Sequence, residues 1–124
     1  MPVLWEWRDK VFLVTTIGAY ENKEMADAFA TMRSHPQFVA GSPVVFDARE
    51  SKATLTKGDV EWRVGSFADA LQRDGFGPRL AFVMTKDEPH RYGIARMVQA
   101  LSQMKGFDTE IFSDVEEALR WARA

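Results

Sequence analysis

The hydrophobic positions of the chain alternate between short strand-like runs and longer stretches with helical spacing. The expected strands cover residues 4–8, 11–17, 44–46, 80–84 and 109–112. After all but the first of these runs, apolar residues recur every three or four positions, which indicates one buried face of a helix. The four stripes of this kind are Met25, Ala28, Phe29 and Met32; Val60, Val64, Phe67, Ala68 and Leu71; Ile94, Met97, Val98, Leu101 and Met104; and Val115, Ala118, Leu119 and Ala122.

Proline, glycine and capping residues mark the expected ends of these helices. Pro36 ends the first helix, because proline disfavours a helical residue before it, and Gly75 and Gly106 end the second and third. Two sequences are typical of helix N-termini: 56–59, where Thr is followed three residues later by Asp, and 113–116, where Ser is followed by Glu.

The element order is therefore β-β-α-β-α-β-α-β-α, with the polar stretch 48–58 as a loop after the third strand. Strands that alternate with helices need crossover connections. We therefore expect one α/β domain over residues 1–124, an N-terminal hairpin followed by a mostly parallel sheet of about five strands with about four helices. The run 80–84 has no polar alternation, as in a strand buried on both faces. In such sheets, ligands bind beyond the carboxyl ends of the strands, at a switch point in strand order.

Composition excludes several classes of protein without changing this fold. The chain has 124 residues, 46% hydrophobic and 27% charged, as in globular domains. Its 16 Lys and Arg against 18 Asp and Glu give a net charge of −2, which excludes nucleic-acid binding driven by bulk charge. The absence of cysteine excludes disulfides and thiolate metal sites. No apolar run approaches the roughly 20 residues of a membrane span, and no signal peptide is recognisable, so we expect a cytoplasmic protein.

Polar side chains come directly after several of the expected strands. Asp47 ends the third strand, where an aspartate serves either as a functional carboxylate or as a loop cap, and Arg49 follows it. Lys86, Arg91 and Arg96 would surround the start of the third helix, where they could form an anion pocket.

An enzyme would have to be assembled from Asp47, His90 and Tyr92, because the chain carries no familiar catalytic sequence. Residues 64–68 have alanine where a G-x-S-x-G nucleophile elbow has its second glycine. The P-loop, G-x-G-x-x-G and H-E-x-x-H patterns are also absent. His90 has no second ligand at metal-binding spacing, so we expect no metal and no cofactor.

Four methionines lie on two of the expected helical faces, Met25 and Met32 on the first helix and Met97 and Met104 on the third. Methionine adapts to irregular surfaces, so these faces would either fill the core or part to admit an acyl chain. Trp62, beside the stripe of the second helix, is either a packed residue or a membrane-interface anchor.

Several segments resemble the SpoIIAA-like proteins, also called STAS/SEC14-domain proteins. They are PVVFDAR at 43–49, RYGIARM at 91–97, IFSDVEEALRW at 111–121 and HPQF at 35–38. The resemblance spans residues 10–121 and implies a STAS-like α/β fold, a non-enzymatic role, and binding of protein partners or small ligands. In related anti-anti-sigma factors a phosphorylated Ser or Thr follows the third strand. Ser51, Thr54 and Thr56 occupy that loop here, which lacks the Asp-Ser-Ser-Gly-type signature and differs in length.

Two functions follow as expectations. The first is a non-enzymatic module that binds a lipid or other apolar ligand, or associates peripherally with a membrane; its candidate residues are Tyr20, Met25, Met32, Trp62, Lys86, Arg91, Tyr92, Arg96, Met97 and Met104. The second is a regulatory protein–protein interaction domain of the anti-anti-sigma kind; its candidate residues are Asp47, Arg49, Ser51, Thr54 and Thr56. A homodimer is a further alternative, because Trp5 and Trp7 lie on an expected edge hairpin.

Overall fold

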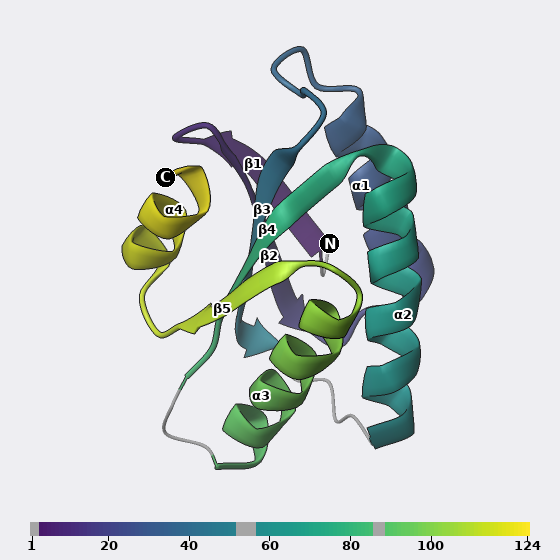
Figure 1. Cartoon of the computed structure of the whole chain (residues 1–124), viewed down its shortest axis with the longest axis vertical. Helices are drawn as coiled ribbons and strands as arrows, with labels where there is room; N and C mark the ends of the chain where they lie inside the picture. Colours follow the sequence, from purple (N-terminus) through teal and green to yellow (C-terminus); the bar gives the residue numbers. More distant parts are fainter. Residues whose placement is uncertain (1–2, 52–56, 86–88) are drawn as a thin grey trace.

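A computed structural model describes residues 3–51, 57–85 and 89–124, which form a five-stranded sheet and four helices (Figure 1). The strands are β1 (Val3–Arg8), β2 (Val11–Gly18), β3 (Ser42–Ser51), β4 (Phe76–Val83) and β5 (Asp108–Phe112). The helices are α1 (Asn22–Arg33), α2 (Lys57–Asp74), α3 (Pro89–Met104) and α4 (Val115–Arg123). The element order expected from the sequence is confirmed.

The strands follow one another across the sheet in the order β1-β2-β3-β4-β5. β1 pairs antiparallel with β2, and β2 to β5 are parallel, as the sequence predicts. Because every crossover joins neighbouring strands in the same direction, α1, α2 and α3 lie on one face, while α4 follows the last strand and covers the other (Figure 1). The strand order of this sheet never reverses, so the sheet has no switch point. The expectation of a ligand site at a switch point is therefore wrong.

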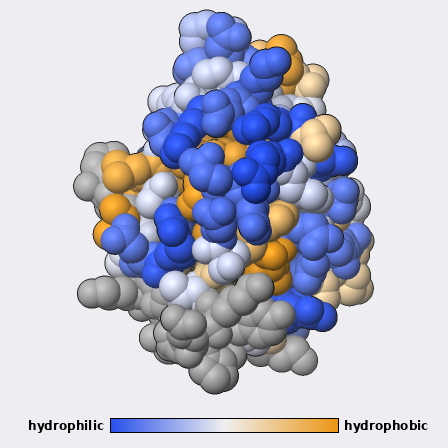
Figure 2. Space-filling model, turned by 90° about the vertical axis from the view of Figure 1, so that its left-hand side faces the viewer, coloured by the Kyte–Doolittle hydropathy of each residue, from blue (hydrophilic) through white to orange (hydrophobic). Residues whose placement is uncertain are grey.

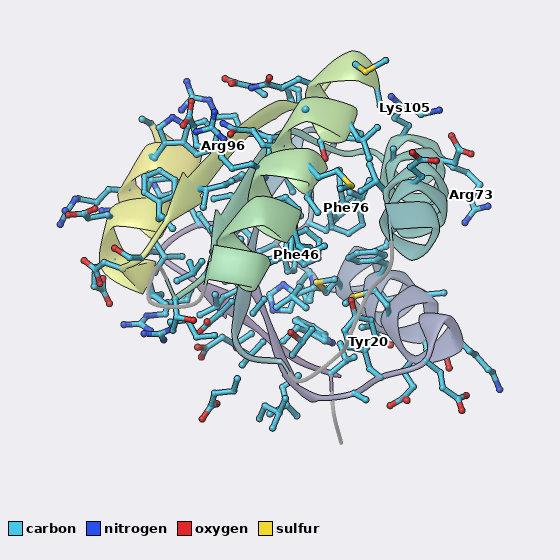
Figure 3. All side chains as sticks on the ribbon, turned by 90° about the horizontal axis from the view of Figure 1, so that it is seen from below. Tyr20, Phe46, Arg73, Phe76, Arg96 and Lys105 are labelled. Atoms are coloured by element: carbon cyan, nitrogen blue, oxygen red, sulfur yellow. The ribbon has the colours of Figure 1, made fainter. Side chains whose placement is uncertain are left out.

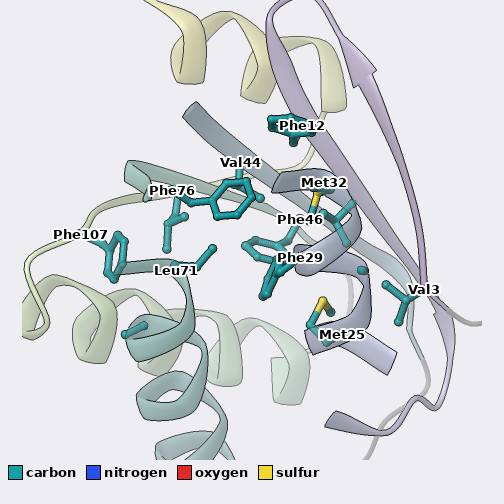
Figure 4. Packing of buried hydrophobic residues seen from close by; sticks show 14 residues of the cluster. Val3, Phe12, Met25, Phe29, Met32, Val44, Phe46, Leu71, Phe76 and Phe107 are labelled. Atoms are coloured by element: carbon teal, nitrogen blue, oxygen red, sulfur yellow. The ribbon is translucent and has the colours of Figure 1, made fainter. Parts of the chain in front are cut away.

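The larger core lies between the sheet and the helices α1 and α2 (Figure 4). Alternation along β2 sends Phe12 and Val14 into this core and Val11 and Leu13 toward α4, which is why the whole run is buried. The labelled aromatic and sulfur side chains in Figure 4 converge on it; among them are Phe12, Met25, Phe29, Met32, Phe46 and Phe76.

The smaller core lies under α4, which packs Ala118, Leu119 and Ala122 against β2, β3 and β4. Leu80 contributes to the larger core and Ala81 and Val83 to the smaller one, so the expectation of a strand buried on both faces is confirmed. The N-cap of α4 is Asp114, whose carboxylate accepts the N–H of Glu116 at 3.3 Å. The helix therefore begins one residue later than its sequence pattern indicates.

Two strands, β3 and β4, extend beyond their expected bounds by more than one residue. β4 begins at Phe76, four residues before Leu80, because Phe76 belongs to the core and pairs with Ser42. Gly77 makes this start possible, since its φ is +87° and a Cβ there would lie 2.7 Å from the ring of Phe107. β3 continues to Ser51, so residues 48–51 are strand and not loop.

Candidate functional site

The carboxyl half of β3 carries a β-bulge. Thr15 of β2 pairs with Asp47 of β3. The next pair is Ile17 with Glu50, so β2 advances by two residues while β3 advances by three. β3 therefore holds one extra residue, which breaks the regular alternation of side chains at Arg49. Bulges re-aim individual side chains, and this one lies where a parallel sheet presents its strand ends.

The bulge brings Asp47 and Arg49 together in a bidentate ion pair. The Nε and Nη2 atoms of Arg49 lie 2.9 Å from Oδ1 and Oδ2 of Asp47, and the Arg49 backbone N–H donates to Oδ1 at 3.2 Å. The Asp47 side chain is 11% exposed and that of Arg49 is 43% exposed. Arg49 thus covers a nearly buried carboxylate and keeps part of its guanidinium in water.

Carboxylates surround this single guanidinium. The hydrogen bonds that Arg49 donates to Asp47 raise the pKa of Arg49 above its ordinary value. Burial opposes that rise, while the charges of Asp47, Glu50 and Asp114 add to it. Asp114 also caps α4, so its backbone position is fixed by the helix start. Among the described residues that act on Arg49, the charge balance is negative.

An exposed isoleucine lies beside these charges. Alternation along β2 puts Ile17 on the same face as Leu13, the face that α4 covers, yet Ile17 is 42% exposed. The reason is that α4 spans only nine residues and packs on the first half of β2, at Val11 and Leu13. Figure 2 shows this side of the molecule as largely hydrophilic with separate apolar areas. We define the β3-bulge surface as Ile17, Asp47, Arg49, Glu50 and Asp114.

The chemistry of this surface suits binding better than catalysis. Asp47 is already neutralised by Arg49 and receives three hydrogen bonds from it, so its carboxylate is poorly placed to take a substrate proton. Of the other enzyme candidates, the side chains of His90 and Tyr92 lie outside the described residues. Within the described part of the chain, no three His, Asp or Glu side chains lie close enough to hold a metal ion.

The methionines do not all lie where their spacing indicates. Met25 and Met32 are fully buried in the larger core, and Met97 is half-buried. Met104 is 82% exposed, so its expected inward position is wrong: it is the last residue of α3, beyond the end of the packed face. α2 packs against both α1 and α3, so the two methionine pairs are on helices that flank a third.

The remaining candidates are dispersed. Tyr20 is half-buried against the larger core, whereas Arg96 is exposed on α3, and Figure 3 shows the two well apart. Lys86, Thr54 and Thr56 lie outside the described residues, as do the side chains of Ser51, Trp62, Arg91 and Tyr92. Their expected roles stay predictions. In the described residues, no helix is long and apolar enough to span a membrane.

Comparison with known proteins identifies the fold. No family model and no curated protein matches the sequence. The crystal structure of an uncharacterised protein of the DUF3478 family with a SpoIIAA-like fold, from Shewanella loihica PV-4, superposes with a TM-score of 0.62 at 13% identity, covering 97% of this chain and 91% of that one. The chain therefore has the SpoIIAA-like fold that its sequence resembles.

Proposed function

We propose that this chain is a non-enzymatic interaction module that binds a protein partner through the β3-bulge surface. One observation carries the proposal: the exposed Ile17 pairs with Glu50, the residue that follows Arg49, and Asp47 holds the guanidinium of Arg49 in place. An apolar side chain bordered by oriented charges is the arrangement of a specific protein interface, where the apolar contact supplies affinity and the charges supply orientation.

The charges of the surface define the partner. Within the described residues, Asp47, Glu50 and Asp114 against Arg49 make this surface net negative, so a fitting segment carries Lys or Arg around an apolar residue that covers Ile17. The ion pair between Asp47 and Arg49 is already formed in the free protein. Binding therefore does not have to order the Arg49 side chain, which lowers the entropic cost of association.

Regulation by phosphorylation would act at the end of the strand that carries this surface. Ser51 is the last residue of β3 and directly follows Glu50. A phosphate on this residue would add roughly −1.5 to −2 charge one residue along the chain from Glu50. We expect such a modification to change partner binding, as in the anti-anti-sigma reading of the sequence.

Site-specific photo-crosslinking tests the proposal. A benzophenone amino acid replaces Ile17 in one variant and Val39, exposed at a distant loop, in a matched control. In extract from the source organism, we expect a discrete crosslinked protein from position 17 and none from position 39. Adding Glu50→Lys to the position-17 variant should abolish the crosslink, because the substitution reverses a charge that the basic partner needs.

The identified protein is then purified and its dissociation constant measured for wild type and Glu50→Lys. Weakening by tenfold or more would support the proposal. Equal crosslinking from both positions, or affinity that does not respond to the charge reversal, would contradict it. Turnover of a substrate class that depends on Asp47 would show instead that the module is an enzyme.

A further inference from the structure

The two edges of the sheet differ in how they are protected. On β5, the carbonyl of Thr109 accepts hydrogen bonds from the side-chain amides of Gln99 and Gln103, at 3.0 and 3.4 Å. On the opposite side, β1 has β2 as its one neighbour, and it runs six residues without a proline. Proteins usually block such an edge with proline, bulges or covering side chains. β1 has neither a proline nor a bulge; its two charged residues are Glu6 and Arg8, and Arg8 is paired with Glu116.

We propose that two copies of this chain pair through β1, antiparallel, to form one continuous ten-stranded sheet. This inference goes beyond the proposed function and does not depend on it. Antiparallel strands of two identical copies are related by a twofold axis normal to the sheet. Such an axis keeps each face on its own side, so residues directly opposite each other have numbers of the same parity.

The sequence of β1 selects the register. An axis through Glu6 would set two carboxylates opposite each other, which is unfavourable. An axis through Trp7 would extend the strand pairing to Asp9, whose φ of +52° ends the strand. It would also place Arg8 in the interface, although Arg8 already forms an ion pair with Glu116 at 2.6 Å. An axis through Trp5 avoids both problems.

With the axis through Trp5, the facing pairs are Trp5 with Trp5, Val3 with Trp7, and Leu4 with Glu6. The first two pairs extend the aromatic border of the larger core, where Trp5 and Trp7 pack against Phe12 at 5.9 and 4.8 Å between ring centroids. Aromatic cross-strand pairs are among the more favourable ones in sheets. The third pair covers Leu4, which is 46% exposed in the single chain.

The dimer has a consequence for binding. Since the axis is normal to the sheet, both β3-bulge surfaces lie on the same side of the joined sheet. A partner with two copies of its docking segment would then bind bivalently, and the second contact would form at a high effective concentration.

Substitutions at Leu4 test both the dimer and its register. Leu4→Lys, Leu4→Glu and the neutral reference Leu4→Gln are compared with wild type by sedimentation equilibrium over a concentration series. Because Leu4 is exposed, all three variants should fold, which circular dichroism checks. In the proposed register, Leu4→Lys faces Glu6 twice per dimer and should bind several-fold more tightly than Leu4→Gln, while Leu4→Glu should bind several-fold more weakly.

Each result decides the proposal. Wild type that stays monomeric at every concentration overturns it, as does an equal dissociation constant for the Lys and Glu variants. Tighter binding by Leu4→Glu than by Leu4→Lys also overturns it, because that order places Leu4 opposite Arg8. Glu110→Lys on β5 is the control for the other edge and should leave the dissociation constant unchanged. A changed dissociation constant in Glu110→Lys would indicate that the dimer interface lies at β5, and would contradict the proposed pairing through β1.

Discussion

Arg49 is held by a partner only two residues earlier on the same strand, an arrangement that the extra residue in β3 makes possible. Its raised pKa, caused mainly by the hydrogen bond to Asp47, means that its contribution to stability is present at neutral pH and is lost only in strong base. We expect a double-mutant cycle of Asp47→Asn and Arg49→Gln to give a coupling of about 0.5–1 kcal/mol, since Arg49 is partly solvated. Urea unfolding measures it, and a coupling of zero would mean that the pair does not form in solution.

Among the described residues, two buried hydroxyls lack a hydrogen-bond partner, those of Thr16 and Thr109. Burying an unpaired hydroxyl costs about 1–3 kcal/mol, and valine has nearly the same shape without that group. Thr109→Val should therefore raise the free energy of unfolding by about 1 kcal/mol. Thr31→Val is the matched control, because the exposed Thr31 hydroxyl donates to the Asp27 carbonyl at 2.9 Å, and it should give no gain. Loss of stability in Thr109→Val would show that the Thr109 hydroxyl makes a hydrogen bond in solution.

At the scale of elements, the helix α2 contains a glycine that its packing does not require. Gly65 lies inside the helix, and a Cβ built there meets no atom of the described residues within 4 Å. Gly65→Ala should stabilise the chain by about 0.5–1 kcal/mol, because alanine loses less backbone entropy on folding. Gly77→Ala is the opposite case, with a φ of +87° and a clash with Phe107, and should lower the melting temperature. A drop in melting temperature for both variants would mean that α2 has a close neighbour at Gly65.

The sequence predicts helices and strands well where one face is buried, and less well where pairing between strands determines the structure. The stripes of α1 and α4 and the two-sided burial of β4 follow from local periodicity. The continuation of β3 through Arg49 and Glu50 does not, because this polar run is held as strand by its pairing with β2. Asp47 could be identified as a candidate because it ends an apolar run. Its ion pair with Arg49 could not be predicted, because it depends on a bulge that no local pattern encodes. Met104 is a case where the local pattern predicts too much. It has the helical spacing of a buried residue, but it is exposed.

At the scale of the whole molecule, the order of the helices bears on the apolar-ligand hypothesis. A shared pocket needs the faces of Met25 and Met32 on α1 and of Met97 on α3 to open toward each other, yet α2 contacts both helices and the first two side chains are fully buried. We therefore expect native mass spectrometry of gently purified protein to show no lipid-sized adduct that denaturation removes. Such an adduct would require α1 and α3 to separate, at the expense of the packing between Phe29 and Phe46. Its detection would favour a carrier over the docking module, and a phosphate-sized increment that survives denaturation would instead direct attention to Ser51, beside the β3-bulge surface.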